Sequence, residues 1–88
     1  MSKHAPVAEY VSPSRTQSIY RFNNDYGASV VCDPHSYGGP EGFFELAVLD
    51  KNGHLCYSTP ITDDVIGWLT IRKVQNLLTK IANLPKEL

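Results

Sequence analysis

The sequence predicts an α+β fold of the order ββββα: a four-stranded antiparallel sheet, made of two consecutive hairpins, covered by one C-terminal amphipathic helix. Three observations lead to this prediction. Short runs of aromatic and β-branched residues alternate with turn-forming Asn, Asp and Gly. The pair Asn52-Gly53 is a strong short-range hairpin signal. Beyond residue 70, apolar residues recur at helical spacing.

The first hairpin is expected within residues 18–32. Residues 19–22 and 28–32 have the aromatic and β-branched composition of strands. Between them, residues 23–27 read NNDYG, and Asn, Asp and Gly adopt turn conformations at low cost. The sequence therefore predicts two antiparallel strands joined by a five-residue loop.

The second hairpin follows a long surface loop over residues 33–42, which contains two prolines and three glycines. Residues 43–49 form the strongest strand pattern of the chain, and residues 54–58 are expected to return antiparallel to them. The turn between these two strands is Asp50 to Gly53.

The helix is expected from Ile71 to about Asn83, with Thr70 as its N-cap and Pro85 beyond its end. An apolar stripe runs along one side of it and consists of Ile71, Val74, Leu78 and Ile81, broadened by Leu77 and Leu84. Before this helix, Asp63 is expected to cap a single helical turn that reaches Trp68, and the indole is expected to pack in the core.

Residues 1–17 contain two prolines and no sustained period, so we expect a flexible or extended tail, followed by a single domain over residues 18–88. One helix of this length covers part of a four-stranded face. A second copy of the chain would complete the cover, and we therefore expect a homodimer.

The formal net charge of −1 does not describe a polycation that grips nucleic acid through its backbone. The charge is unevenly distributed, because residues 23–64 hold seven carboxylates against Lys51 alone, a net −6. No apolar stretch reaches the length of about 20 residues that a membrane span needs, and no signal peptide is apparent. We expect a cytoplasmic protein without a membrane anchor.

Two cysteines and two histidines form the candidate metal site: Cys32 and His35 leave one predicted strand, and His54 and Cys56 lie two apart on another. Two thiolates and two imidazoles satisfy tetrahedral zinc. The spacing is not that of a zinc knuckle, however, and a whole strand separates the pairs. We therefore expect reduced thiols and no metal or cofactor. No serine or cysteine has a recognisable partner base, so we do not expect an enzyme.

Three long, irregular runs carry a resemblance: YRFNNDYGASVV from Tyr20, SYGGPEGFFELAVL from Ser36 and CYSTPITDDVIGWL from Cys56. They resemble a family of small uncharacterised proteins encoded by bacteriophages and prophages. The similarity covers about residues 19–84. It implies a bacterial cytoplasm and an accessory gene of the kind whose product often acts by binding a host protein.

The function expected from these features is that of a protein-binding module, which modulates a host protein in an anti-defence or anti-CRISPR-like manner. An acidic surface with exposed loop aromatics suits a basic partner. The residues expected to contact the partner are Tyr26, Asp33, Tyr37, Glu41 and Asp50.

The alternative is a ββββα dimer that binds single-stranded nucleic acid on a curved sheet. Tyr20, Phe22, Tyr57 and Arg21 would form a platform on which bases stack, with Arg72, Lys73 and Lys80 adding positive charge. The acidic central segment disfavours this function.

Overall fold

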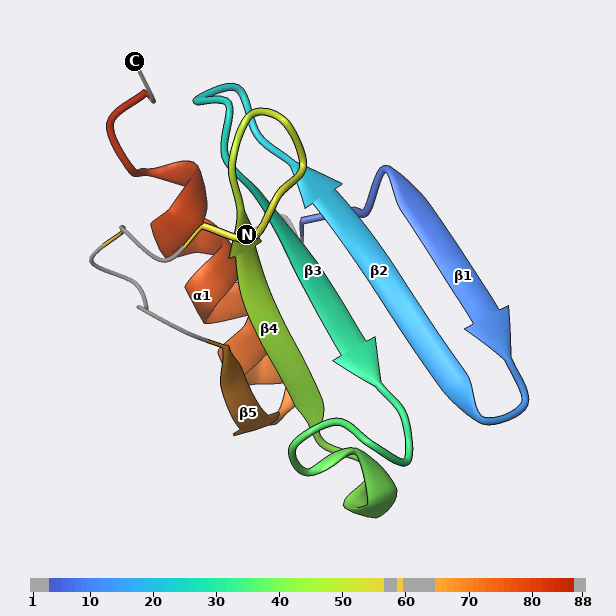
Figure 1. The fold of residues 1–88 in the computed structure, drawn as a ribbon. Helices are drawn as coiled ribbons and strands as arrows, with labels where there is room; N and C mark the ends of the chain where they lie inside the picture. Colours follow the sequence, from blue (N-terminus) through green and yellow to red (C-terminus); the bar gives the residue numbers. More distant parts are fainter. Residues whose placement is uncertain (1–3, 57–58, 60–64, 87–88) are drawn as a thin grey trace.

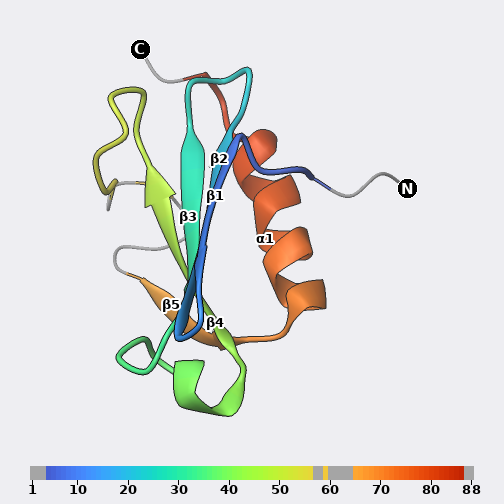
Figure 2. The ribbon, with the colours of Figure 1, turned by 90° about the vertical axis from the view of Figure 1, so that its right-hand side faces the viewer.

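The computed structural model describes residues 4–56, 59 and 65–86, which form one antiparallel sheet with a helix on one of its faces (Figures 1 and 2). The elements, in chain order, are β1 (Ala8–Ser12), β2 (Arg15–Arg21), β3 (Gly27–Cys32), the 3-10 turn η1 (Gly39–Glu41), β4 (Phe44–Leu49), β5 (Ile66–Leu69) and α1 (Ile71–Ala82). The strands lie across the sheet in the order β1-β2-β3-β4-β5. The α+β class, the antiparallel sheet and the C-terminal helix are as the sequence predicts.

The strand count is a first correction, because the sheet has five strands rather than four. The additional strand is β1, which pairs with β2 from Ala8↔Ile19 to Ser12↔Arg15. Pro13 and Ser14 connect the two strands, and both residue types favour a tight turn. The sequence signal for β1 is weak because its five residues are largely exposed on both faces and show no alternating pattern.

The strand beside β4 is a second correction. Within the predicted strand 54–58, Leu55 makes an isolated bridge to Leu49, and residues 57–58 lie outside the described residues. The place in the sheet is taken by β5, which pairs with β4 through Phe44↔Leu69. The sequence predicts a helical turn in this region. Its expected cap, Asp63, also lies outside the described residues.

The helix begins and packs as predicted. The Thr70 hydroxyl accepts the backbone N–H of Lys73 at 3.3 Å, which satisfies one of the free donors of the first turn. Val74, Leu78 and Ile81 are fully buried against apolar residues of β3, β4 and β5. The stripe is narrower than predicted at its start, because Ile71 is 53% exposed.

Different segments of the chain lie at the two ends of the sheet, which we call the turn end and the loop end (Figure 1). At the turn end lie the β2–β3 turn, the turn after β4 and the C-terminal end of α1. At the loop end lie residues 33–43, the last residues of β5 and the start of α1. Arg21 joins the two turns of the turn end, since its guanidinium donates to the carbonyl oxygens of Asp50 at 2.8 Å and Asp25 at 3.0 Å.

Candidate protein-binding site

Three aromatic side chains gather at the loop end of the sheet and form what we call the aromatic end patch: Tyr37, Phe43 and Trp68. Tyr37 is 63% exposed and Trp68 is 55% exposed, while Phe43 is half-buried between loop and strand. The rings of Phe43 and Trp68 pack with their centroids 5.7 Å apart and a tilt of 50°. Large exposed aromatics so close together are uncommon on a surface that serves no contact.

The backbone holds this patch in a constrained arrangement. Trp68 has a φ of 57°, in the left-handed region that residues with a bulky side chain rarely adopt. Its N–H donates to the carbonyl oxygen of Tyr37 at 3.1 Å, which ties β5 to the loop. Gly38, with a φ of 83°, lies beneath the patch, and a Cβ there would meet the Phe43 Cβ at 2.9 Å and the Trp68 Cα at 3.0 Å.

Carboxylates adjoin the patch. Glu45 accepts the backbone N–H of Tyr37 at 2.7 Å, and Glu41 is exposed on η1. Asp33, at the start of the loop, accepts the backbone N–H of His35 at 2.8 Å and pairs with Arg15 at 2.9 Å. These hydrogen bonds, that of the His35 N–H above all, hold the pKa of Asp33 below its usual value. These contacts therefore stabilise the ionised form of the Asp33 carboxyl group.

The five residues predicted to bind a partner lie at two opposite ends of the sheet. Asp33, Tyr37 and Glu41 lie in the loop between β3 and β4, at the loop end. Tyr26 lies in the β2–β3 turn at the other end and packs against the core, so it is not the exposed anchor expected. Asp50 is also at the turn end, where its carboxylate accepts backbone N–H groups within its own turn.

Sequence reasoning missed Phe43 and Trp68 as surface residues. Phe43 was expected inside a strand, and Trp68 was expected in the core. The one local feature that marks this position in the sequence is Gly67, directly before Trp68. In the structure Tyr37 packs so closely against Gly67 that a Cβ there would collide with the Tyr37 side chain. The next residue, Trp68, is 55% exposed.

The predicted metal ligands are not brought together. Cys32 and His35 lie at the loop end, and the Cys32 thiol donates to the carbonyl oxygen of Gly39 at 3.6 Å. Cys56 lies toward the other end, where its N–H donates to the Val48 carbonyl oxygen at 2.8 Å. Among the residues that the structure describes, which include all four candidates, no group of three or more His, Cys, Asp and Glu side chains converges.

The residues suggested for base stacking do not form a platform either. Tyr20 is 6% exposed and Phe22 packs against the core, so neither offers a free ring face. Arg21 uses its guanidinium for the two carbonyl contacts of the turn end. Tyr57 lies outside the described residues.

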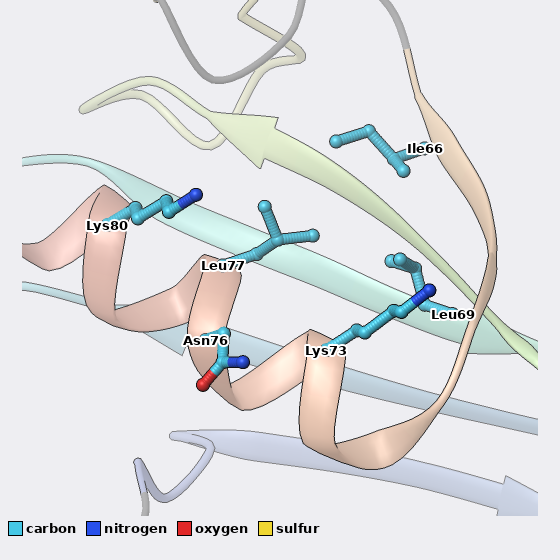
Figure 3. Close-up of a pocket in the computed structure, with 6 residues that line it drawn as sticks. All are labelled: Ile66, Leu69, Lys73, Asn76, Leu77 and Lys80. Atoms are coloured by element: carbon cyan, nitrogen blue, oxygen red, sulfur yellow. The ribbon is translucent and has the colours of Figure 1, made fainter.

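A hollow of about 310 Å³ opens between α1 and β5 (Figure 3). We call it the lysine-rimmed hollow, and it is lined by Ile66, Leu69, Lys73, Asn76, Leu77 and Lys80. Leu77 and Ile66 point toward one another across it, and the two lysines extend along the helix side.

Comparison of the chain with protein-family models, curated proteins and solved structures gives no match. No helix within the described ranges is long and apolar enough to cross a membrane. Within the described residues, the aromatic end patch and the lysine-rimmed hollow are two surfaces from which a function can be argued.

Proposed function

We propose that the chain is a protein-binding module that contacts its partner through the aromatic end patch. The observation that carries this proposal is the exposed Trp68, held next to Phe43 by a left-handed backbone. Trp and Tyr dominate the binding energy of protein interfaces because they bury a large area at little cost in side-chain entropy. Tyr37 and Trp68 are the anchors of the proposed contact.

The partner that fits this surface is a basic protein. Glu45 accepts the backbone N–H of Tyr37, and Glu41 is exposed on η1 in the same loop. Carboxylates beside a contact surface attract a basic partner and make the association rate sensitive to salt. The resemblance to bacteriophage and prophage proteins leads us to propose a host protein in the bacterial cytoplasm as this partner, in an anti-defence or anti-CRISPR-like role.

The conformation of Trp68 allows binding to be separated from folding. A left-handed residue with a side chain costs about 1–2 kcal/mol, and glycine removes this cost. Loss of the Phe43–Trp68 contact costs about 0.5–1.5 kcal/mol, and the added backbone freedom of glycine costs a little more. Loss of the partly buried area of the indole adds a further cost, so we expect Trp68→Gly to lower the free energy of unfolding by at most about 3 kcal/mol while removing the central ring of the patch.

The experiment is affinity capture from bacterial lysate at low salt, with the immobilised wild type, Trp68→Gly, Tyr37→Ala and Leu55→Ala. Leu55 is 50% exposed beyond β4, outside both the patch and β1, and is the matched control. We expect the same basic protein to be retained by the wild type and by Leu55→Ala, and to be lost with either patch variant. Equal retention by Trp68→Gly and the wild type, with both folded, refutes the proposed surface.

We further propose that two copies associate through β1. This strand stands at the edge of the sheet, and α1 packs against the three strands at the opposite side, β3, β4 and β5. A terminal strand presents backbone N–H and C=O groups to an added strand. Tyr10 and Val11 are 60% and 75% exposed on it. Sedimentation equilibrium should give twice the mass of 9.8 kDa for the wild type and the single mass for Val11→Pro. A monomeric wild type contradicts this proposal.

A further inference from the structure

The lysine-rimmed hollow marks a place where the helix leaves the core incompletely covered. Ile66 and Leu77 pack against the buried core and yet stay half-exposed, whereas Leu69 beside them is buried. Figure 3 shows Leu77 facing Ile66 across the opening. The hollow therefore has an apolar floor shared between α1 and β5, and a ligand with an apolar body would shield it from water.

The rim of this hollow is cationic. Lys73 and Lys80 are two helical turns apart, which places their Cα atoms about 10.5 Å apart along the axis, with Leu77 between them. Both ammonium groups extend along the opening in Figure 3, and the remaining polar lining residue, Asn76, is neutral. Among the residues that the structure describes, the lining thus carries two positive charges and no carboxylate, which favours an anion.

The same charges disfavour a second copy of the chain as the occupant. A two-fold contact through this surface would place Lys73 and Lys80 near their own counterparts in the other copy. Like charges that approach in a partly dry interface oppose association. A small anion meets no such repulsion.

We propose that the lysine-rimmed hollow binds an amphiphilic carboxylate, a soluble molecule with one carboxylate on an aliphatic body. The aliphatic body lies over Leu77 and Ile66, and the carboxylate pairs with Lys73 or Lys80 at the rim. The proposal concerns the helix side of β5 and does not depend on the function proposed for the aromatic end patch. A partner bound at the patch and a carboxylate bound in the hollow are separate events.

The size of the charge effect follows from the exposure of the rim. An exposed lysine–carboxylate pair changes affinity by a factor of about 1.4 to 5, and the single carboxylate forms one such pair at a time, so the loss of both lysines weakens binding about 1.4- to 5-fold. The apolar contact contributes equally to a charged and an uncharged ligand. Decanoate should therefore bind more tightly than decanol, and added salt should reduce that difference.

The experiment is a titration of the full chain with decanoate, below its micelle concentration, followed by the methyl NMR signals of leucine and isoleucine. The test variant is Lys73→Gln/Lys80→Gln. The matched control is Arg72→Gln/Lys86→Gln, which removes the same charge from residues that do not line the hollow. Decanol is titrated in parallel, and the near-UV circular dichroism of each variant verifies its folding.

We expect decanoate to shift the methyl signals of Ile66, Leu69 and Leu77 in the wild type and in the control variant. In the test variant we expect an affinity for decanoate that is weaker by about 1.4- to 5-fold and an unchanged affinity for decanol. Equal weakening in both double variants overturns the proposal, since the effect would then reflect net charge. The proposal is also overturned if decanol binds as tightly as decanoate, or if the shifts are confined to other methyl groups. It is likewise overturned if a second copy of the chain fills the hollow.

Discussion

The side chain of Asn24 connects the β2–β3 turn to the end of the helix, and its removal is a demanding test of the fold. Its amide nitrogen donates to the carbonyl oxygens of Ile81 at 2.7 Å and Leu84 at 3.0 Å. Its amide oxygen accepts the backbone N–H of Tyr26 at 3.0 Å. The carbonyl oxygen of Ile81 also accepts the N–H of Leu84 at 3.1 Å, so the Asn24 side chain adds a second donor at the end of the helix and ties the residues that follow it to the β2–β3 turn.

The expected cost of Asn24→Ala follows from these three hydrogen bonds. Each contributes about 0.5–1.5 kcal/mol net, and the freed groups regain part of this from water because the site is half-buried. We expect a loss of about 2 kcal/mol in the free energy of unfolding. For a chain of 88 residues this lowers the melting temperature by about 8–16 °C.

The assay is urea-induced unfolding, monitored by far-UV circular dichroism of the helix. Asn23→Ala is the matched control, because Asn23 precedes Asn24 in the same turn and is exposed. Asn24→Asp keeps the acceptor for Tyr26 but places a carboxylate against the negative end of the helix, so it should be no more stable than Asn24→Ala. If Asn24→Ala and Asn23→Ala unfold within 0.5 kcal/mol of each other, as a rough threshold for a surface change, the connection contributes no stability and the reasoning fails.

Three further predictions concern backbone, charge and core. Gly38→Ala should lower the melting temperature more than Gly53→Ala does. Both glycines have a positive φ, but of these two positions only Gly38 has neighbouring atoms within reach of an added Cβ. Equal decreases in melting temperature would contradict the close contact at Gly38. Hydrogen bonds from backbone N–H groups lower the pKa of Asp33 and of Asp50 below 3.8 in the folded chain. Near these pKa values the unfolded chain binds more protons than the folded chain. The stabilisation of the folded state by the two ionised carboxylates is therefore present above about pH 4 and is lost as the pH falls through the folded pKa values. Asp33→Asn/Asp50→Asn should flatten the dependence of urea stability on pH below about pH 4, and an unaltered slope contradicts the assignment. Leu78→Ala, at a fully buried position, should cost about 2–5 kcal/mol in urea unfolding, and a loss below 1 kcal/mol would show that the helix does not close the core.

The helix and the first predicted hairpin could be anticipated because their signals are local. Thr70 caps a helix whose partners lie three and four residues along the chain, and the apolar spacing of Val74, Leu78 and Ile81 specifies one face. The NNDYG turn likewise joins strands that are neighbours in sequence. Interactions between residues that are close in the chain can be inferred from the sequence alone.

The place of β5, the addition of β1 and the outward position of Trp68 arise only in the folded chain. The strand beside β4 is selected by pairing across the sheet, where Phe44 meets Leu69, and no periodicity around residue 66 indicates that partner. Trp68 lies outside the core in a segment that contacts Tyr37, which is far away in sequence: Tyr37 packs against Gly67, and its carbonyl oxygen accepts the Trp68 N–H at 3.1 Å. Nearby residues encode caps, turns and faces, whereas long-range packing decides which strands meet and which aromatic rings remain exposed to solvent.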